Sequence, residues 1–111
     1  MARIAVVIPD LLLGSNVQGW LRAAGHDAAM VSAGAPLADY DLLVVDLMVD
    51  GVDAAAFAAL GPPTLGVFAH TQPDVRARAL EAGFDLVVPR SRMAREGAAL
   101  VAGLLAPPAG A

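Results

Sequence analysis

The short run Leu42-Leu43-Val44-Val45 constrains the fold of this chain more than any other stretch. It has no polar face, and Asp41 before it and Asp50-Gly51 after it bound it tightly. Such a run is typical of a strand that is covered on both sides in a parallel sheet. Asp46 follows at once, so its carboxylate is expected at the carboxyl edge of the sheet, where open α/β sheets place their chemistry.

Further short apolar runs are expected to form strands, and helical patterns separate them. This alternation predicts right-handed βαβ units, and hence a parallel sheet with helices on both faces. The second helix is expected to be truncated, because residues 32–40 are rich in Ala, Gly and Pro and hold at most one helical turn. We expect strands at residues 3–8, 27–31, 41–47, 64–68 and 86–88, and helices at 15–24, 54–60, 72–82 and 92–105.

The start of the first helix is predicted from Ser15 and Gln18, which have the spacing of a capping box. Residues 10–14 are then expected to form a loop, unless the helix starts early, and Leu11 to Leu13 are expected to lie mainly on the core with at least one leucine exposed. The other predicted caps are Asp53 and Thr71 at helix starts, and Gly25 and Gly83 at helix ends.

Composition narrows the classes of function. The 111 residues include seven arginines, no lysine and no cysteine, and the formal net charge is −4. Disulfide and thiolate chemistry are excluded, and an acidic chain with few aromatic residues argues against binding nucleic acid. No run approaches the roughly 20 apolar residues of a membrane span. We expect one cytoplasmic domain at residues 1–106, followed by a disordered tail at 107–111, with neither nucleic acid nor membrane as a partner.

Three segments resemble, in order and spacing, the receiver domain of bacterial response regulators, which has a flavodoxin-like fold. The resemblance implies a three-layer α/β/α sandwich whose five-stranded parallel sheet has the order 2-1-3-4-5. Residues 46–53 are similar to the segment around the phospho-accepting aspartate of that family, and residues 63–70 and 79–85 are similar to its fourth strand and to a later Leu-Glu-Ala-Gly segment. The resemblance covers essentially the whole chain. It implies a non-enzymatic domain of two-component signalling, with Asp46 as the candidate phospho-acceptor.

The resemblance also implies where the rest of the family's site should fall, and this chain departs from it there. Phosphoryl transfer to a carboxylate brings anions together, so the family neutralises them with Mg²⁺ and a lysine. If a metal binds here, its candidate ligands are Asp10, Asp46 and Met48. The two metal-binding acids of the family fall on Ile8 and Pro9, its lysine on Arg90, its hydroxyl residue on Phe68 and its switch aromatic on Val87.

These departures favour a pseudo-receiver that acts by binding proteins, independently of phosphorylation and without a cofactor. One alternative is a genuine phospho-receiver in a phosphorelay, with Asp46 as acceptor, Asp10 as a makeshift ligand and Mg²⁺ as cofactor. Another is a small-molecule or flavin-binding module, because Gly14-Ser15-Asn16 at a helix start could hold an anion. A metal cluster of Asp10, Asp46, Asp50 and His70 is a weaker expectation, since these residues lack a defined ligand spacing.

An interaction surface is implied by the family's use of its fourth helix, fifth strand and fifth helix for dimers. The expected partner is another protein or a second copy of this chain. Positive charge at the start of the last helix is unfavourable for the helix dipole, so Arg90 is expected either to pair with Asp46 or a partner's acid, or to lie on a solvated face. The arginines expected on this surface are Arg76, Arg78, Arg90, Arg92 and Arg95.

Overall fold

The fold is a five-stranded parallel sheet in the order β2-β1-β3-β4-β5, which confirms both the predicted parallel sheet and the strand order that the family resemblance implied. The structure is a computed structural model that describes residues 2–69 and 71–106, so the expectations for His70 and for the tail at 107–111 lie outside the described residues. Along the chain the elements are β1 (Arg3–Val7), α1 (Leu11–Ala23), β2 (Asp27–Met30), β3 (Leu42–Asp46), α2 (Ala54–Ala58), β4 (Thr64–Phe68), α3 (Pro73–Ala82), β5 (Leu86–Pro89) and α4 (Arg90–Leu105).

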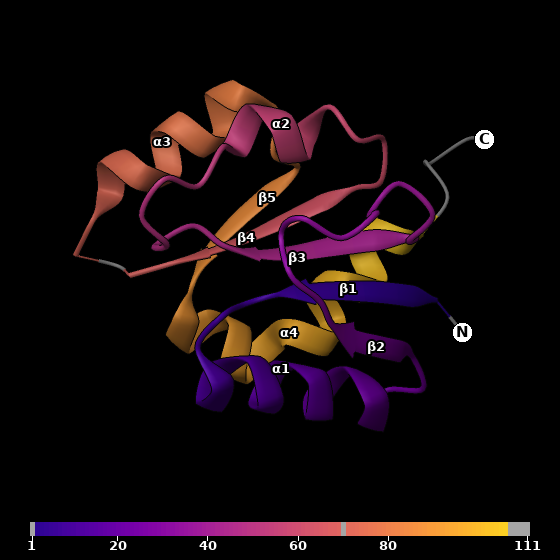
Figure 1. Cartoon of the computed structure of the whole chain (residues 1–111). Helices are drawn as coiled ribbons and strands as arrows, with labels where there is room; N and C mark the ends of the chain where they lie inside the picture. Colours follow the sequence, from indigo (N-terminus) through magenta and orange to yellow (C-terminus); the bar gives the residue numbers. More distant parts are fainter. Residues whose placement is uncertain (1, 70, 107–111) are drawn as a thin grey trace.

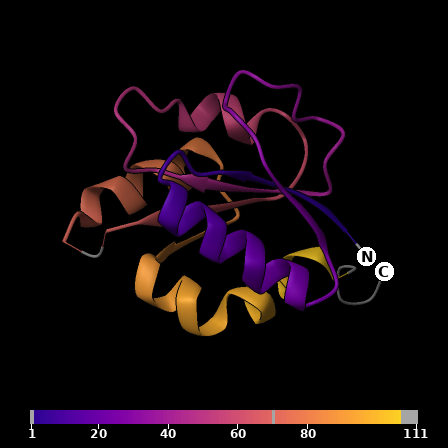
Figure 2. The ribbon, with the colours of Figure 1, turned by 60° about the horizontal axis from the view of Figure 1, so that its bottom comes forward.

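Helices cover both faces of the sheet (Figure 1). Helices α2 and α3 lie on one face, and α1 and α4 lie on the other, where they contact each other (Figure 2). Right-handed crossovers produce this division, because the chain moves one way from β1 to β2 and the other way from β3 to β5. The described helices include none that is long and apolar enough to cross a membrane.

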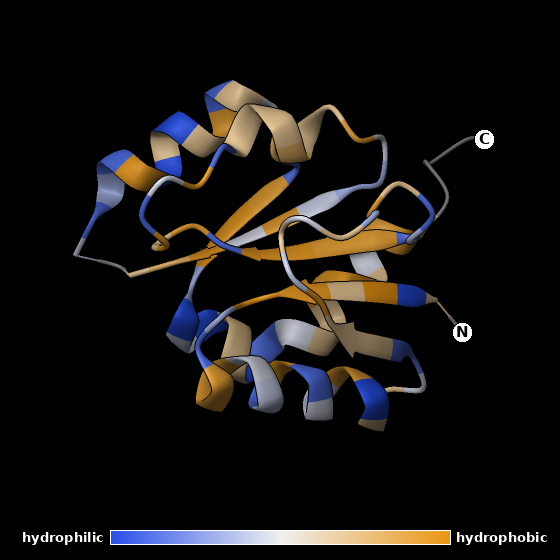
Figure 3. Cartoon of the chain, in the orientation of Figure 1, coloured by the Kyte–Doolittle hydropathy of each residue, from blue (hydrophilic) through white to orange (hydrophobic). Residues whose placement is uncertain are grey.

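The core is divided between the two faces of the sheet. Alternate residues of a strand point to opposite faces, so Leu42 and Val44 pack towards α1 and α4, whereas Leu43 and Val45 pack towards α2 and α3. All five residues of β3 are buried, as expected for a central strand covered on both sides. Apolar residues accordingly fill the strands, and hydrophilic ones lie mainly on helices and loops (Figure 3).

The prediction for the start of α1 was wrong. The helix begins at Leu11, and the Asp10 side chain caps it by accepting a hydrogen bond of 3.1 Å from the Leu13 N–H. Ser15 therefore lies inside the helix, and Gln18 donates from its side chain to the Ala28 carbonyl instead of closing a capping box. The expected loop at 10–14 is mostly helix. Leu11 and Leu12 are each 75% exposed, which confirms that at least one leucine is exposed, and of the three only Leu13 packs against the core.

Two other helix starts differ from the prediction. Gln72, not Thr71, precedes α3, and it makes no capping hydrogen bond with its side chain. Helix α4 begins at Arg90, two residues earlier than expected, because Pro89 has extended backbone and the helix follows it directly. The predicted cap of α2 is confirmed, since the Asp53 carboxylate accepts from the Ala56 N–H.

The link from β2 to β3 is the one crossover between strands of the sheet that contains no helix. Residues 31–41 form turns and bends, which agrees with the prediction of at most one helical turn. Pro36 and Gly34 disfavour a helix in this segment. The segment is thinner than a helix, and this affects how the α2/α3 face of the sheet is covered.

Candidate functional site

Asp46 is the last residue of β3 and lies at the carboxyl edge of the sheet, as predicted. It pairs in register with Val67 of β4, and the residue is only 4% exposed. Its Oδ1 accepts a hydrogen bond of 2.9 Å from the N–H of Met48. The carboxylate therefore holds the turn after β3 while being nearly closed to solvent.

Arg90 supplies the positive charge beside Asp46. Its Nη2 lies 3.7 Å from the Asp46 Oδ2, and the arginine side chain is 45% exposed. Residue 90 can reach the end of β3 because β5 ends at Pro89 and α4 starts at once, at the same edge of the sheet. The pair with Asp46 was one of the alternatives that the sequence left open for Arg90, and the structure selects it.

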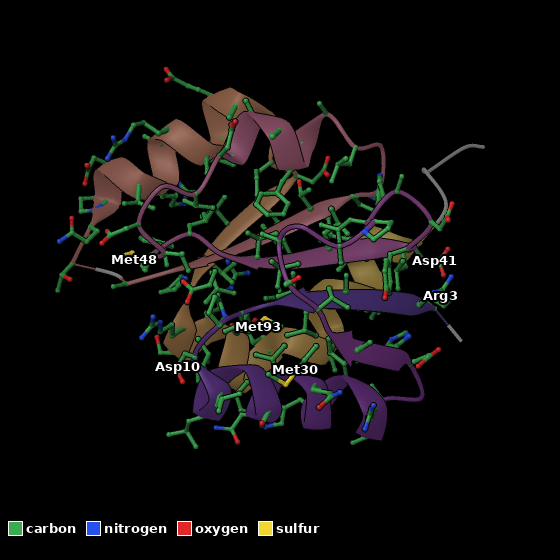
Figure 4. All side chains as sticks on the ribbon, in the orientation of Figure 1. Arg3, Asp10, Met30, Asp41, Met48 and Met93 are labelled. Atoms are coloured by element: carbon green, nitrogen blue, oxygen red, sulfur yellow. The ribbon has the colours of Figure 1, made fainter. Side chains whose placement is uncertain are left out.

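The candidate metal ligands Asp10, Asp46 and Met48 have separate roles in the structure. Asp10 lies at the start of α1, whereas Met48 lies on the side of the sheet that carries α2 and α3 (Figure 4). The carboxylate of Asp10 caps its helix, and Met48 presents its N–H to Asp46. Across residues 2–69 and 71–106, no three His, Cys, Asp or Glu side chains come together as a metal site would need.

Magnesium prefers several oxygen ligands in near-octahedral geometry. The two family positions that would provide acids hold Ile8, which is buried, and Pro9, neither of which has a side-chain oxygen. Besides Asp46, the carboxylates near this edge are Asp10, which caps α1, and Asp50, which is exposed in the turn after β3. The donors present here do not fit the magnesium site of a receiver domain.

Phe68 and Val87 occupy the positions where the family has its hydroxyl residue and its switch aromatic. Both are buried, with exposed fractions of 5% and 3%, and both belong to the core cluster on the α2/α3 face. Phe68 ends β4, and Val87 lies in β5 opposite Gly66. Neither side chain carries a hydrogen-bonding group, and both pack as core residues.

The five arginines expected on an interaction surface are distributed over α3 and α4. Three of them form ion pairs with acids of their own helix: Arg78 with Asp74 at 2.7 Å, Arg92 with Glu96 at 3.3 Å and Arg95 with Glu96 at 3.9 Å. Arg76 is exposed, and Arg90 faces Asp46. Charges are balanced within α3, whereas α4 carries three arginines and one acid, Glu96, so it has an excess of positive charge.

A pocket next to Asp46 was not predicted. It has a volume of about 590 Å³ and lies on the α2/α3 side of the sheet, between the ends of β1 and β3, helix α2 and residues 31–37. The sequence showed that residues 32–40 lack a helical pattern, but we did not infer from it that the neighbouring strands would be incompletely covered. The signal was present: a small, turn-rich segment stands where other crossovers have a helix.

Comparison with known proteins identifies the fold but gives no match by sequence. No model of a known protein family matches the chain, and no curated protein is significantly similar to it. A response regulator from Burkholderia multivorans superimposes with a TM-score of 0.76 at 23% identity, covering 99% of this chain and 100% of the other. NtrX from Brucella abortus gives 0.82 at 20%, covering 94% of this chain and 26% of its own length.

A third similar structure comes from a group described as redox sensors in the streptococci that evolved from two-component response regulators. It superimposes with a TM-score of 0.77 at 13% identity, covering 95% of this chain and 51% of the other. These similarities show that the chain has the fold of response-regulator receiver domains, as the resemblance implied. At such low identity they extend to the fold alone.

Proposed function

We propose that this chain, which has the fold of a response-regulator receiver domain, is a pseudo-receiver: a non-enzymatic signalling module that binds other proteins independently of phosphorylation. The observation that carries the proposal is the state of Asp46. Its carboxylate is buried, one oxygen accepts from Met48, and the other faces Arg90. An acceptor must present a free oxygen to a phosphoryl donor, and this arrangement opposes that.

The residues around Asp46 support the same conclusion. Transfer of a phosphoryl group to a carboxylate needs positive charge placed to neutralise both anions. With Ile8 and Pro9 in the place of two acids, the charge beside Asp46 comes from one arginine, which already pairs with it. One guanidinium supplies a single positive charge, where the family has a divalent ion and a lysine to neutralise the two anions.

The lack of a switch supports independence from phosphorylation. A hydroxyl residue can follow a new phosphoryl group by forming a hydrogen bond, and Phe68 has no such group. Val87 is buried in the same core cluster as Phe68, so phosphorylation of Asp46 is not expected to change the exposure of its side chain. In this proposal, signalling depends on how much of the protein is present and on which partner it binds, and not on phosphorylation.

The proposed contact surface is the face formed by α3, β5 and α4, and the partner is another protein or a second copy of this chain. Arg76 and Arg95 are exposed there, and Leu80 adds an exposed apolar side chain on α3. Arginine next to apolar surface is a common composition of protein interfaces.

The second candidate is a phosphorylated receiver, favoured by the position of Asp46 at the carboxyl end of β3. The two candidates are separated by incubating the protein with acetyl phosphate and Mg²⁺ and weighing it intact. We expect no covalent change, with a conventional receiver domain as the positive control. A gain of one phosphoryl group that Asp46→Asn abolishes would make the pseudo-receiver proposal wrong.

A further inference from the structure

The pocket beside β1 and β3 exists because one layer of the sandwich is incomplete. Helices α2 and α3 cover the sheet over β3 to β5, but over β1 the same face is covered by residues 31–41, which contain no helix (Figure 1). A helix with its side chains has a diameter of about 10 Å, and a turn-rich segment fills less space. The result is a pocket of about 590 Å³.

The interior of this pocket is apolar and is lined by buried residues of the sheet and of α2. Val7 and Val45 form its floor, and both are buried residues of the sheet. Leu37 and Phe57 form walls and are also almost fully buried, whereas Leu60 lies at the rim and is 38% exposed. Pockets of roughly 300–1,000 Å³ with apolar walls are the usual size for small organic ligands.

The charged residues that line the pocket are all acids. They are Asp46, Asp50 and Asp53, and no arginine or histidine of the described chain belongs to the lining. Asp46 faces Arg90 and Asp53 caps α2, but Asp50 is an exposed residue of the turn between β3 and α2. The mouth of an apolar pocket is thus negative, and Asp50 is the carboxylate best placed to meet a cation.

We propose that this pocket binds a small organic cation with an apolar body, of the arylalkylamine class. The apolar part would cover Val7, Val45 and Phe57, and the ammonium group would lie near Asp50. This binding role goes beyond the proposed protein contacts, because it uses the opposite end of the α2/α3 layer from the arginine-bearing α3/β5/α4 face. A flavin nucleotide fits the pocket poorly, since its phosphate would meet the acids of the mouth.

The test uses three probes that share one apolar body and differ in the head group: phenylbutylamine, phenylbutanol and phenylbutanoate. Each is titrated into the full chain while amide proton–nitrogen NMR spectra are recorded. We expect saturable shifts at residues 31–37 and 49–57, with the amine binding most tightly and the carboxylate least. Equal or tighter binding of phenylbutanoate would overturn the proposed ligand class.

Two pairs of variants locate the site. Ala56 lines the pocket and Ala55 does not, although both are exposed on α2, so Ala56→Trp fills the pocket and Ala55→Trp is its matched control. We expect Ala56→Trp to abolish binding and Ala55→Trp to retain it. Asp50→Asn should weaken the amine roughly threefold and leave phenylbutanol unchanged. Asp39→Asn makes the same change of charge outside the lining and should have no effect.

Three results would overturn the proposal. One is the absence of saturable shifts with phenylbutylamine, and another is equal loss of binding in the two tryptophan variants. The third is a set of shifts at the same amides that grows with protein concentration alone, because that would place a second copy of the chain in the pocket. Unchanged dispersion of the remaining amide signals verifies in each case that the variant is folded.

Discussion

The guanidinium of Arg90, the first residue of α4, lies 3.7 Å from the carboxylate of Asp46, the last residue of β3. The two residues are far apart in the sequence and meet because β3 and β5 end at the same edge of the sheet. This contact links the acid at the carboxyl edge to the helix that begins there. It gives Arg90 a local partner, which offsets the unfavourable position of a cation at a helix start.

The first prediction concerns the contribution of the Asp46–Arg90 pair to the free energy of unfolding. Arg90→Ala is expected to lower the free energy of unfolding by about 1 kcal/mol, because a buried carboxylate loses its cation, while the exposure of the guanidinium limits the effect. The measurement is urea denaturation. Arg90→Ala should cost clearly less in an Asp46→Asn background, and Arg95→Ala, at an exposed site, serves as the control. An equal cost in both backgrounds would show that the two side chains are not coupled.

The second prediction distinguishes the two candidate caps of α1. Asp10→Ala should lower the free energy of unfolding by about 1 kcal/mol, because the Leu13 N–H loses its acceptor. Asp10→Ser should restore most of the loss, since a serine oxygen can also cap. Ser15→Ala should change stability by less than about 0.5 kcal/mol, because alanine is a good residue inside a helix. If Ser15→Ala costs more stability than Asp10→Ala, Ser15 and not Asp10 caps the helix.

The third prediction concerns the start of β4. The carboxylate of Asp85 accepts from the Thr64 N–H at 2.8 Å and from its hydroxyl at 3.3 Å, and Thr64 is only 1% exposed. Asp85→Ala leaves these donors without their acceptor, so thermal and urea denaturation should show a loss of about 1–3 kcal/mol. Asp85→Asn keeps one acceptor oxygen and should lose less. If Asp39→Ala on an exposed turn costs as much, the hydrogen bonds are not the cause.

The fourth prediction compares a glycine at a helix end with a glycine inside a helix. Gly83 has φ 112°, and an added Cβ would lie 3.1 Å from the Ala58 Cβ, so Gly83→Ala should destabilise the fold by about 1–2 kcal/mol. Gly103 lies inside α4, and an added Cβ there meets nothing within 4 Å. Gly103→Ala should therefore stabilise by up to about 1 kcal/mol. Changes of the same sign in both variants, measured by thermal unfolding, would refute the role of backbone conformation.

The strands could be predicted from the sequence because each is a short apolar run bounded by turn-forming residues. In β3, for example, Leu42 to Val45 read as a buried strand, and the structure confirms it. The helix ends were harder. Asp10 and Ser15 are both good capping residues, and the choice between them depends on where β1 delivers the chain, which a local pattern does not contain.

The candidate site was predicted only in outline. Asp46 could be predicted as the acid of the site, since it follows the central strand, and Arg90 could be predicted as one of its possible partners. The separation of Asp10 from Met48 could not be foreseen, because residues that lie at one edge of a sheet can still belong to opposite layers (Figure 4). The pocket also escaped prediction, since a void is a property of several elements together.

The sequence by itself determined the five strands, their parallel direction and the acid at the carboxyl edge, because hydrophobic runs and crossover rules act locally or through simple topology. The order of the strands followed from the family resemblance. The tertiary structure decided which charges meet and which surfaces stay uncovered. Both depend on the three-dimensional path of connections such as residues 31–41 and on the volume those connections fill. The contact of Asp46 with Arg90 and the pocket beside β1 therefore depend on how the layers pack, which the sequence pattern does not contain.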